Sequence, residues 1–276
     1  MREPGSVVCP TDLECVFSRP NSMTDCITHY CPGCSHGVFH RLVGELLDEF
    51  ALTDRAIMVC PVGCAAFAYR YFECDQIQAS HGRAPAVATG VKRPLPDRFV
   101  FTYQGDGDLA SIGMSETIHA AARGEPITVF FVNNGIFGMT GGQMAPTTLA
   151  GQVTTTSVAG RACETTGRPL DVCKLLSSLP GVAFLARASL ATPRQIHTCR
   201  SYMRKAIRAQ LEGKGFGLVE ALGTCPTQWH MSPTACMDHI DQVVVKEFPP
   251  GVFVDRVDDP APESAESAAV KRGYCL

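Results

Sequence analysis

Segment 98–132 constrains the fold of this chain more than any other part of the sequence. Residues 98–104 (RFVFTYQ) are rich in β-branched and aromatic side chains, which predicts a strand. A Gly-Asp-Gly-Asp turn follows at 105–108, then a stretch of helical character over about 110–123, then the unbroken apolar run 127–132 (ITVFFV). A strand, a glycine-rich turn, a helix and a wholly apolar strand in this order predict a βαβ unit in a buried parallel sheet.

Other segments continue the same alternation of helices and strands. Apolar residues at three- and four-residue steps predict an amphipathic helix over about 36–51, and residues 56–60 read as a short buried strand. Residues 182–188 and 216–221 predict strands on either side of a helix over about 193–211, which is a second strand–helix–strand unit. Residues 138–168 form a long loop rich in Gly, Thr and Pro, a common place for function. We therefore predict an α/β fold with a mostly parallel sheet and helices on both faces.

The chain divides into three parts by composition. Residues 1–30 predict an irregular N-terminal arm, and residues 31–254 carry the predicted strands, helices and motifs of one α/β domain. Residues 255–276 are dominated by Asp, Pro, Glu, Ser and Ala, which predicts a flexible, disordered tail.

Composition excludes several classes of protein. Apolar residues make up 45% and charged residues 18% of the 276 residues, which argues against bulk disorder, and a net charge of −3 gives no electrostatic reason to expect a nucleic-acid partner. No apolar run reaches the roughly 18 residues of a membrane span, and the N-terminus lacks the apolar core of a signal peptide. We therefore expect a cytoplasmic protein, in whose reducing surroundings the 14 cysteines are mostly free thiols or ligands.

Two polar residues follow neighbouring strands of the predicted sheet. Asp106 comes after strand 98–104, and Asn134 comes after strand 127–132. Ligands of α/β sheets bind beyond the carboxyl ends of the strands, and Mg²⁺ prefers oxygen ligands together with phosphate oxygens. A carbonyl just beyond, that of Ile136, could supply a third oxygen. Either turn alone is common, but both at consecutive strand ends favour a magnesium and diphosphate site.

The motif Cys31-Pro-Gly-Cys34 is the most suggestive feature of the cysteines, but it is ambiguous by itself. It fits half a zinc ribbon, a redox dithiol or half an iron–sulfur site. The sequence holds no second pair with this spacing, since Cys60 and Cys64 are four residues apart, so a simple paired zinc site is disfavoured.

Several segments together resemble one known family. A GDGD segment followed by 24 residues and then NN resembles the thiamine-diphosphate motif, and the remaining segments are more specific. The chain resembles, over about residues 18–254, the β subunit of 2-oxoacid:ferredoxin oxidoreductases of the 2-oxoisovalerate or 2-oxoglutarate type. The segments that carry the resemblance are YCPGCSHG at 30–37, PVGC at 61–64, HGRAPAVATGVKRP at 81–94, YQGDGDLASIG at 103–113, GMTGGQMAPTT at 138–148 and CPTQWHMSP at 225–233.

The resemblance implies roles for individual residues. Mg²⁺ would be held by Asp106, Asn134 and the carbonyl of Ile136. His81 would be a catalytic residue of this chain, while the glutamate that activates the cofactor is expected on a partner subunit. The cofactor would be lined by Gly63, Cys64, Ala65, His81, Gly107, Asp108, Gly138 and Met139. A [4Fe–4S] cluster would be bound by Cys31, Cys34, Cys64 and Cys225.

The resemblance also implies an activity and partners. The activity would be oxidative decarboxylation of a 2-oxoacid to acyl-CoA and CO2, with electrons passed through the [4Fe–4S] cluster to ferredoxin. An α subunit would complete the active site, γ and ferredoxin-like δ subunits would complete the complex, and coenzyme A would be a substrate.

The same motifs also fit two other functions. The first is a cluster-free thiamine-diphosphate decarboxylase or synthase subunit, which would not need the four cysteines. The second is a zinc-binding structural module. The substrate is also open, because an apolar Phe137 suits a branched-chain acid but does not exclude 2-oxoglutarate.

Overall fold

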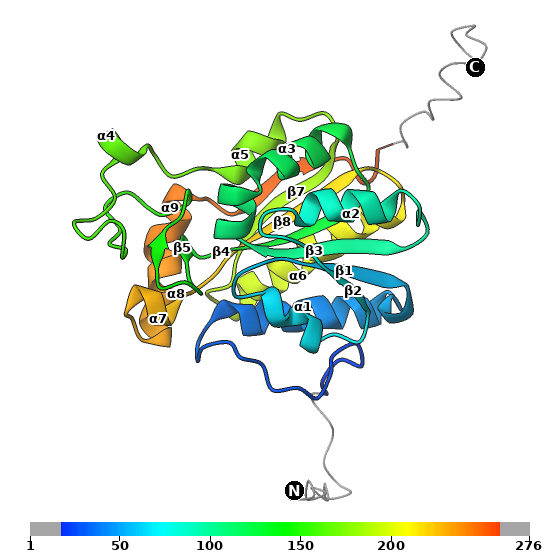
Figure 1. The fold of residues 1–276 in the computed structure, drawn as a ribbon, viewed down its shortest axis with the longest axis horizontal. Coiled ribbons are helices and arrows are strands. Elements are labelled where there is room, and N and C mark those ends of the chain that lie inside the picture. Colours follow the sequence, from blue (N-terminus) through cyan, green and yellow to red (C-terminus); the bar gives the residue numbers. More distant parts are fainter. Residues whose placement is uncertain (1–17, 260–276) are drawn as a thin grey trace, which may run out of the picture.

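A seven-stranded sheet forms the centre of the molecule (Figure 1). The computed structural model describes residues 18–259, so most of the predicted arm and tail, together with Cys9, Cys15 and Cys275, lies outside the described residues. The strand order is β2-β1-β3-β4-β8-β7-β9, in which all neighbours pair in parallel except β9, which is antiparallel to β7. The strands are β1 (Ala56–Cys60), β2 (Asp75–Gln78), β3 (Phe99–Gly105), β4 (Thr128–Asn133), β7 (Val182–Ser189), β8 (Phe216–Leu222) and β9 (Gly251–Asp255).

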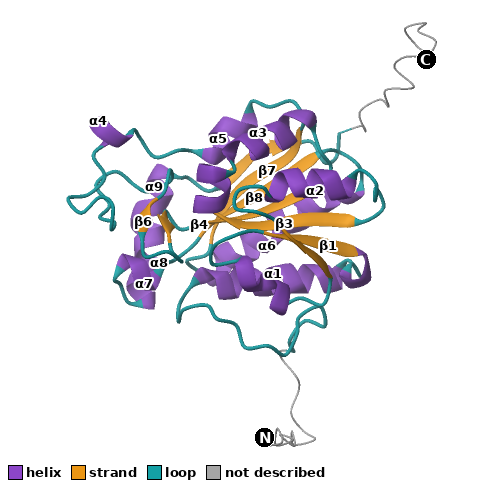
Figure 2. Ribbon diagram, viewed as in Figure 1, coloured by secondary structure: helices purple, strands orange, loops and turns teal. Residues whose placement is uncertain are grey.

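Helices cover both faces of this sheet (Figure 2). Adjacent residues of β3 enter different cores: Phe101 packs on the side of α1 and α6, and Val100 packs on the side of α2, α3 and α5. This two-sided burial explains the unbroken apolar run in β4 and confirms the predicted mostly parallel α/β fold. The helices are α1 (Ser35–Glu49), α2 (Ala84–Lys92), α3 (Met114–Arg123), α5 (Val172–Ser177) and α6 (Pro193–Leu211).

Short elements gather at the carboxyl-terminal edge of the sheet. The segment 138–168, predicted as a long loop, contains β6 (Gln143–Met144) and the helical turn α4 (Cys163–Thr166); β6 pairs antiparallel with β5 (Ile136–Phe137), which lies just before the segment. Beyond β8 the chain forms α7 (Pro226–Trp229), α8 (Pro233–His239), the π-helical turn η4 (Ile240–Val244) and α9 (Val245–Glu247). The 3₁₀ turns η1 (Thr53–Arg55) and η2 (Ala66–Arg70) flank β1.

The helix predicted over about 110–123 is interrupted. A π-helical turn, η3 (Gly107–Ile112), ends at Gly113, and the regular helix α3 begins after it. A Cβ at Gly113 would lie 2.4 Å from the carbonyl oxygen of Gly82, so only glycine allows the two backbones to approach this closely. Such π-turns are frequent at functional sites.

Order continues beyond residue 254. Asp255 completes β9, and Val257 is only 1% exposed in the core that also contains α1 and α6. Within residues 18–259, the structure contains no helix with the length and apolarity needed to cross a membrane.

Candidate functional site

A cavity opens where β1, β3 and β4 end, at the edge of the sheet predicted to bind ligands. Nearly all residues predicted to hold Mg²⁺ or to line the cofactor lie in its wall; Ala65 is the exception, since its side chain is buried in the core. The wall also contains residues that were not assigned to the site. The cavity is lined by His36, Val62, Gly63, Cys64, His81, Gly105, Asp106, Gly107, Asp108, Asn134, Ile136, Phe137, Gly138, Met139 and Thr140.

Asp106 is a buried carboxylate that lacks a positively charged partner among the described residues. It is 2% exposed; its Oδ1 accepts a hydrogen bond from the Gly107 amide (2.8 Å), and its Oδ2 accepts from the Ile136 amide and the Thr147 hydroxyl (both 3.1 Å). Burial raises the pKa of this carboxyl to about 6. A bound cation would stabilise a buried anion that has no counter-charge, so the Asp106 carboxylate fits the role of a Mg²⁺ ligand.

Asn134 lies beside Asp106 because both side chains share one backbone donor. The Ile136 amide donates to Asp106 Oδ2 and also to Asn134 Oδ1 (3.3 Å), which brings two candidate metal ligands onto one side of the loop. The preceding Asn133 points elsewhere: its amide group donates to the buried Glu220 at 2.7 Å. The structure thus separates the two asparagines into one that faces the cavity and one that anchors the turn.

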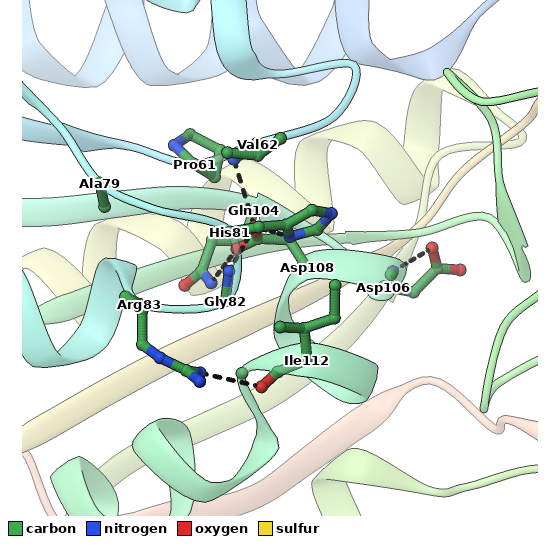
Figure 3. A network of polar contacts seen from close by, with 12 residues as sticks. Pro61, Val62, Ala79, His81, Gly82, Arg83, Gln104, Asp106, Asp108 and Ile112 are labelled. Carbon is green, nitrogen blue, oxygen red and sulfur yellow. Dashed lines mark hydrogen bonds and ion pairs between the residues drawn. The ribbon is translucent and has the colours of Figure 1, made fainter.

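Asp108 connects three loops around the cavity (Figure 3). Its Oδ1 accepts hydrogen bonds from the amides of Gly82 (2.9 Å) and Val62 (3.2 Å), and its Oδ2 accepts from Gln104 (2.6 Å). His81 Nδ1 lies 2.7 Å from the same Oδ1. The ring is not aligned for a hydrogen bond at Nδ1, so this contact is electrostatic. The His81 side chain is 32% exposed and lines the cavity, so the imidazole is accessible to a ligand there.

His36 is a second histidine in the cavity wall, directly after the CPGC motif. Its Nδ1 lies 2.8 Å from the hydroxyl of Tyr103, and burial lowers its pKa to about 4. His36 is therefore neutral near pH 7 and can act there as a hydrogen-bonding group without adding charge.

A second cavity next to the first is lined by the four cysteines predicted to bind a cluster, Cys31, Cys34, Cys64 and Cys225. Cys64, Asn134 and Gly138 line both cavities. A Cβ at Gly138 would lie 3.4 Å from Sγ of both Cys64 and Cys225, so the glycine leaves room beside the two sulfurs.

The chemistry of these four side chains fits a metal cluster. Burial raises the pKa of Cys34 to about 11 and that of Cys64 and Cys225 to about 12, so without metal these thiols stay protonated until iron displaces the protons. Within residues 18–259, no three His, Cys, Asp or Glu side chains approach closely enough to bind one metal ion. The four cysteines line one cavity, and a [4Fe–4S] cubane needs four thiolates on four different irons.

Several contacts of the site could not be found by motif position alone. Thr147 supports Asp106 from 41 residues away, and the ring of Phe137 lies where a Cβ on Gly107 would be, 2.4 Å from that position. Cys60, four residues before Cys64, is buried in the core of β1 and lines neither cavity.

Comparison with known proteins agrees with this geometry. Residues 61–221 match the family model of the thiamine pyrophosphate enzyme C-terminal TPP binding domain, and this range holds all three candidate metal ligands. The chain belongs to the thiamine pyrophosphate enzyme family. The resemblance inferred from the motifs is confirmed, and thiamine pyrophosphate (thiamine diphosphate) is the cofactor that the matched domain binds.

Relatives of this thiamine pyrophosphate enzyme domain have two sizes. Ketoisovalerate oxidoreductase subunit VorA of Methanothermobacter thermautotrophicus is 49% identical over 92% of this chain, which spans only about half (53%) of that relative. The chain likewise spans 53% of VorA from Methanothermobacter marburgensis, to which it is 47% identical. By contrast, 2-oxoglutarate synthase subunit KorB of Archaeoglobus fulgidus is 33% identical, with 83% of this chain and 85% of the relative covered.

A solved structure supports the fold. The 2-oxoglutarate:ferredoxin oxidoreductase from Magnetococcus marinus superposes with a TM-score of 0.72 over 95% of this chain and 92% of that one, at 21% identity. At this identity the match establishes the thiamine pyrophosphate enzyme fold and nothing finer.

Proposed function

We propose that this chain is the β subunit of a CoA-acylating 2-oxoacid:ferredoxin oxidoreductase and that it carries both thiamine diphosphate and a [4Fe–4S] cluster. The observation that carries the proposal is that Cys64 lines both the cofactor cavity and the cavity of the four cysteines. An electron acceptor bound to Cys64 would lie directly beside the electron donor. A cluster-free decarboxylase or synthase would have no use for this arrangement.

In this proposal the residues of the first cavity hold magnesium and the diphosphate. Asp106 and Asn134 provide a carboxylate and an amide oxygen, and the carbonyl of Ile136 provides a third oxygen. Gly63, Gly107 and Gly138 have no side chains, so their backbone can contact the phosphates. When bound, thiamine diphosphate supplies the carbon nucleophile and electron sink that 2-oxoacid decarboxylation requires.

His81 is the catalytic residue that we assign to this chain. The Asp108 carboxylate lies 2.7 Å from Nδ1 and positions the ring at the cavity, where the imidazole would exchange a proton with an oxygen of the substrate. The backbone amides of Gly82 and Val62 on the same carboxylate fix its position relative to the loop that carries His81. His81 and Asp108 would thus act as a pair in which the carboxylate orients the imidazole.

The second active-site half is proposed to come from an α subunit. Among the described residues no glutamate lines the cofactor cavity, so the glutamate that activates the cofactor is assigned to that partner. The extra length of the VorA relatives is consistent with a further functional unit next to this one. We propose γ and ferredoxin-like δ subunits as the other members, ferredoxin as acceptor, coenzyme A as acyl acceptor and the cytoplasm as location.

The substrate is proposed to be 2-oxoisovalerate, with 2-oxoglutarate as the second candidate. Identity is higher to the ketoisovalerate oxidoreductase subunits than to the 2-oxoglutarate synthase subunits. No lysine or arginine among the described residues lines the cofactor cavity, whereas Phe137, Ile136 and Met139 do, which suits an apolar side chain better than a second carboxylate.

The experiment that tests the proposal uses the chain co-expressed with its α subunit and reconstituted anaerobically. We expect iron and acid-labile sulfide at four atoms each per cluster, and CoA-dependent reduction of ferredoxin by 2-oxoisovalerate faster than by other 2-oxoacids. Cys225→Ser should abolish acceptor reduction, whereas Cys163→Ser, a cysteine outside both cavities, should not. Thiamine-dependent turnover without iron would favour the cluster-free enzyme, and bound zinc without cofactor binding would favour the structural module.

A further inference from the structure

Helix α7 is a single turn that links the two cavities. It begins directly after Cys225, and the amide of Trp229 donates to the carbonyl of Cys225 at 2.9 Å. Pro226, Thr227 and Gln228 line the cysteine cavity. The helix, labelled α7 in Figure 1, is therefore attached to one of the four cysteines through its own backbone.

Two side chains of α7 bind the loop that bears the cofactor residues. The indole Nε1 of Trp229 donates to the carbonyl of Asn134 (3.1 Å), and Nε2 of Gln228 donates to the carbonyl of Gly138 (3.0 Å). Asn134 and Gly138 are two of the three residues that line both cavities. One helical turn thus holds both ends of loop 134–138 and one cluster cysteine together.

Packing fixes both side chains in these positions. The Trp229 ring makes an edge contact with His239, with ring centroids 5.3 Å apart, and the indole is part-buried. Oε1 of Gln228 lies 2.8 Å from the position of a Cβ on Gly142, whose φ of +85° also favours glycine. Gln228 therefore occupies a space that exists because residue 142 has no side chain.

We propose that Trp229 and Gln228 are positioning residues that couple occupancy of the cluster to binding of the diphosphate cofactor. The inference rests on the proposed function, since it needs a cluster at Cys225 and a cofactor beside Asn134. A cluster bound to Cys225 fixes α7, and α7 in turn fixes the two carbonyl groups of loop 134–138. By thermodynamic reciprocity, cofactor binding then favours the cluster to the same extent.

The test compares cofactor affinity with and without the cluster. The dissociation constant of thiamine diphosphate with Mg²⁺ is measured by calorimetry on the α–β complex, prepared with and without anaerobic cluster reconstitution. Trp229→Phe keeps an aromatic ring and loses the N–H donor, and Gln228→Glu keeps the shape and replaces the donor by an acceptor. We expect the wild-type complex to bind the cofactor more tightly when the cluster is present. Each variant should reduce that ratio by about 2- to 12-fold, the effect of one net hydrogen bond.

Gln143→Glu is the matched control. Nε2 of Gln143 also donates to a backbone carbonyl, that of Thr140 (2.8 Å), but this bond stays inside the β5–β6 hairpin and does not reach α7. The control makes the same chemical change and should keep the wild-type ratio. A merely structural role for α7 would weaken binding equally in both forms of the complex and leave the ratio unchanged.

The outcomes separate this inference from the proposed function. A wild-type complex that binds no iron or no thiamine diphosphate would overturn the proposed function and the inference with it. A wild-type complex that binds both, with equal cofactor affinity in the two forms or with the ratio preserved in Trp229→Phe and Gln228→Glu, would overturn only the inference.

Discussion

Replacing Gly138 with alanine should separate the stability of the polypeptide from its ability to hold a cluster. The backbone of Gly138 is outside the left-handed region, so alanine is allowed there, and the new methyl group would lie 3.4 Å from Sγ of Cys64 and of Cys225. That distance is at the short limit of van der Waals contact, and free thiols can rotate away from the methyl group. Loss of chain entropy in the unfolded state should therefore leave the cluster-free protein unchanged or more stable by about 0.4–1 kcal/mol.

The cluster-loaded form should respond in the opposite direction. Sulfurs bonded to iron cannot rotate away from the methyl group, so the contact becomes overpacking, which costs about 1–3 kcal/mol and corresponds to about 5- to 150-fold weaker retention of the cluster. The assay is iron and acid-labile sulfide content after anaerobic reconstitution, followed by loss of the visible absorbance on addition of an iron chelator. Gly90→Ala in α2, where a Cβ meets nothing within 4 Å, is the control. Full iron content and wild-type resistance to the chelator in Gly138→Ala would refute the assignment of these sulfurs to one cluster.

Three further substitutions test other contacts, two in the site and one in the core of the sheet. Thr147→Val removes the hydroxyl that donates to Asp106, and it should weaken Mg²⁺-dependent binding of thiamine diphosphate by about 2- to 12-fold in calorimetry; unchanged affinity would contradict a supporting role. Asp108→Asn removes the charge beside His81 and weakens the hydrogen bonds that join the loops around the cavity. We expect kcat to fall more than KM rises, and the free energy of unfolding in chemical denaturation to fall by about 1–3 kcal/mol. Equal changes in kcat and KM with an unchanged free energy of unfolding would argue against this role of Asp108. Glu220→Leu leaves the fully buried Arg187 without its fully buried ion-pair partner. The free energy of unfolding, measured by urea titration, should fall by about 3–5 kcal/mol. A loss below about 1 kcal/mol would show that Asp171 alone is enough to balance the charge of Arg187.

The parts of the fold that the sequence predicted are those with strong local periodicity. The fully buried β4 and the amphipathic α1 and α6 lie close to their predicted positions, because a strand buried on both faces and a helix buried on one each leave a clear pattern. Residues 73–97 did not show such a pattern although they contain β2 and α2. β2 is an edge strand with mostly exposed polar residues, and α2 is a short helix with Pro85 in its first turn and Gly90 inside it.

Some residues of the candidate site could be grouped from the sequence pattern, whereas others could not. Asp106 and Asn134 could be placed together from the sequence, because consecutive parallel strands end at the same edge of the sheet. The four cysteines could be grouped only through the family resemblance, since Cys34 and Cys225 are separated by most of the domain. Contacts such as Trp229 to Asn134 join residues 95 positions apart through one hydrogen bond, and no local pattern encodes them.

We propose that electrons pass from a 2-oxoacid in the cofactor cavity to an iron–sulfur cluster in the cysteine cavity, which shares Cys64 with it. The most direct measurement is electron paramagnetic resonance of the anaerobically reconstituted α–β complex after one addition of 2-oxoisovalerate in the absence of ferredoxin. We expect a reduced-cluster signal that requires Mg²⁺ and thiamine diphosphate and is lost in Cys225→Ser. Release of CO2 from a complex that binds iron but keeps its cluster oxidised would contradict it.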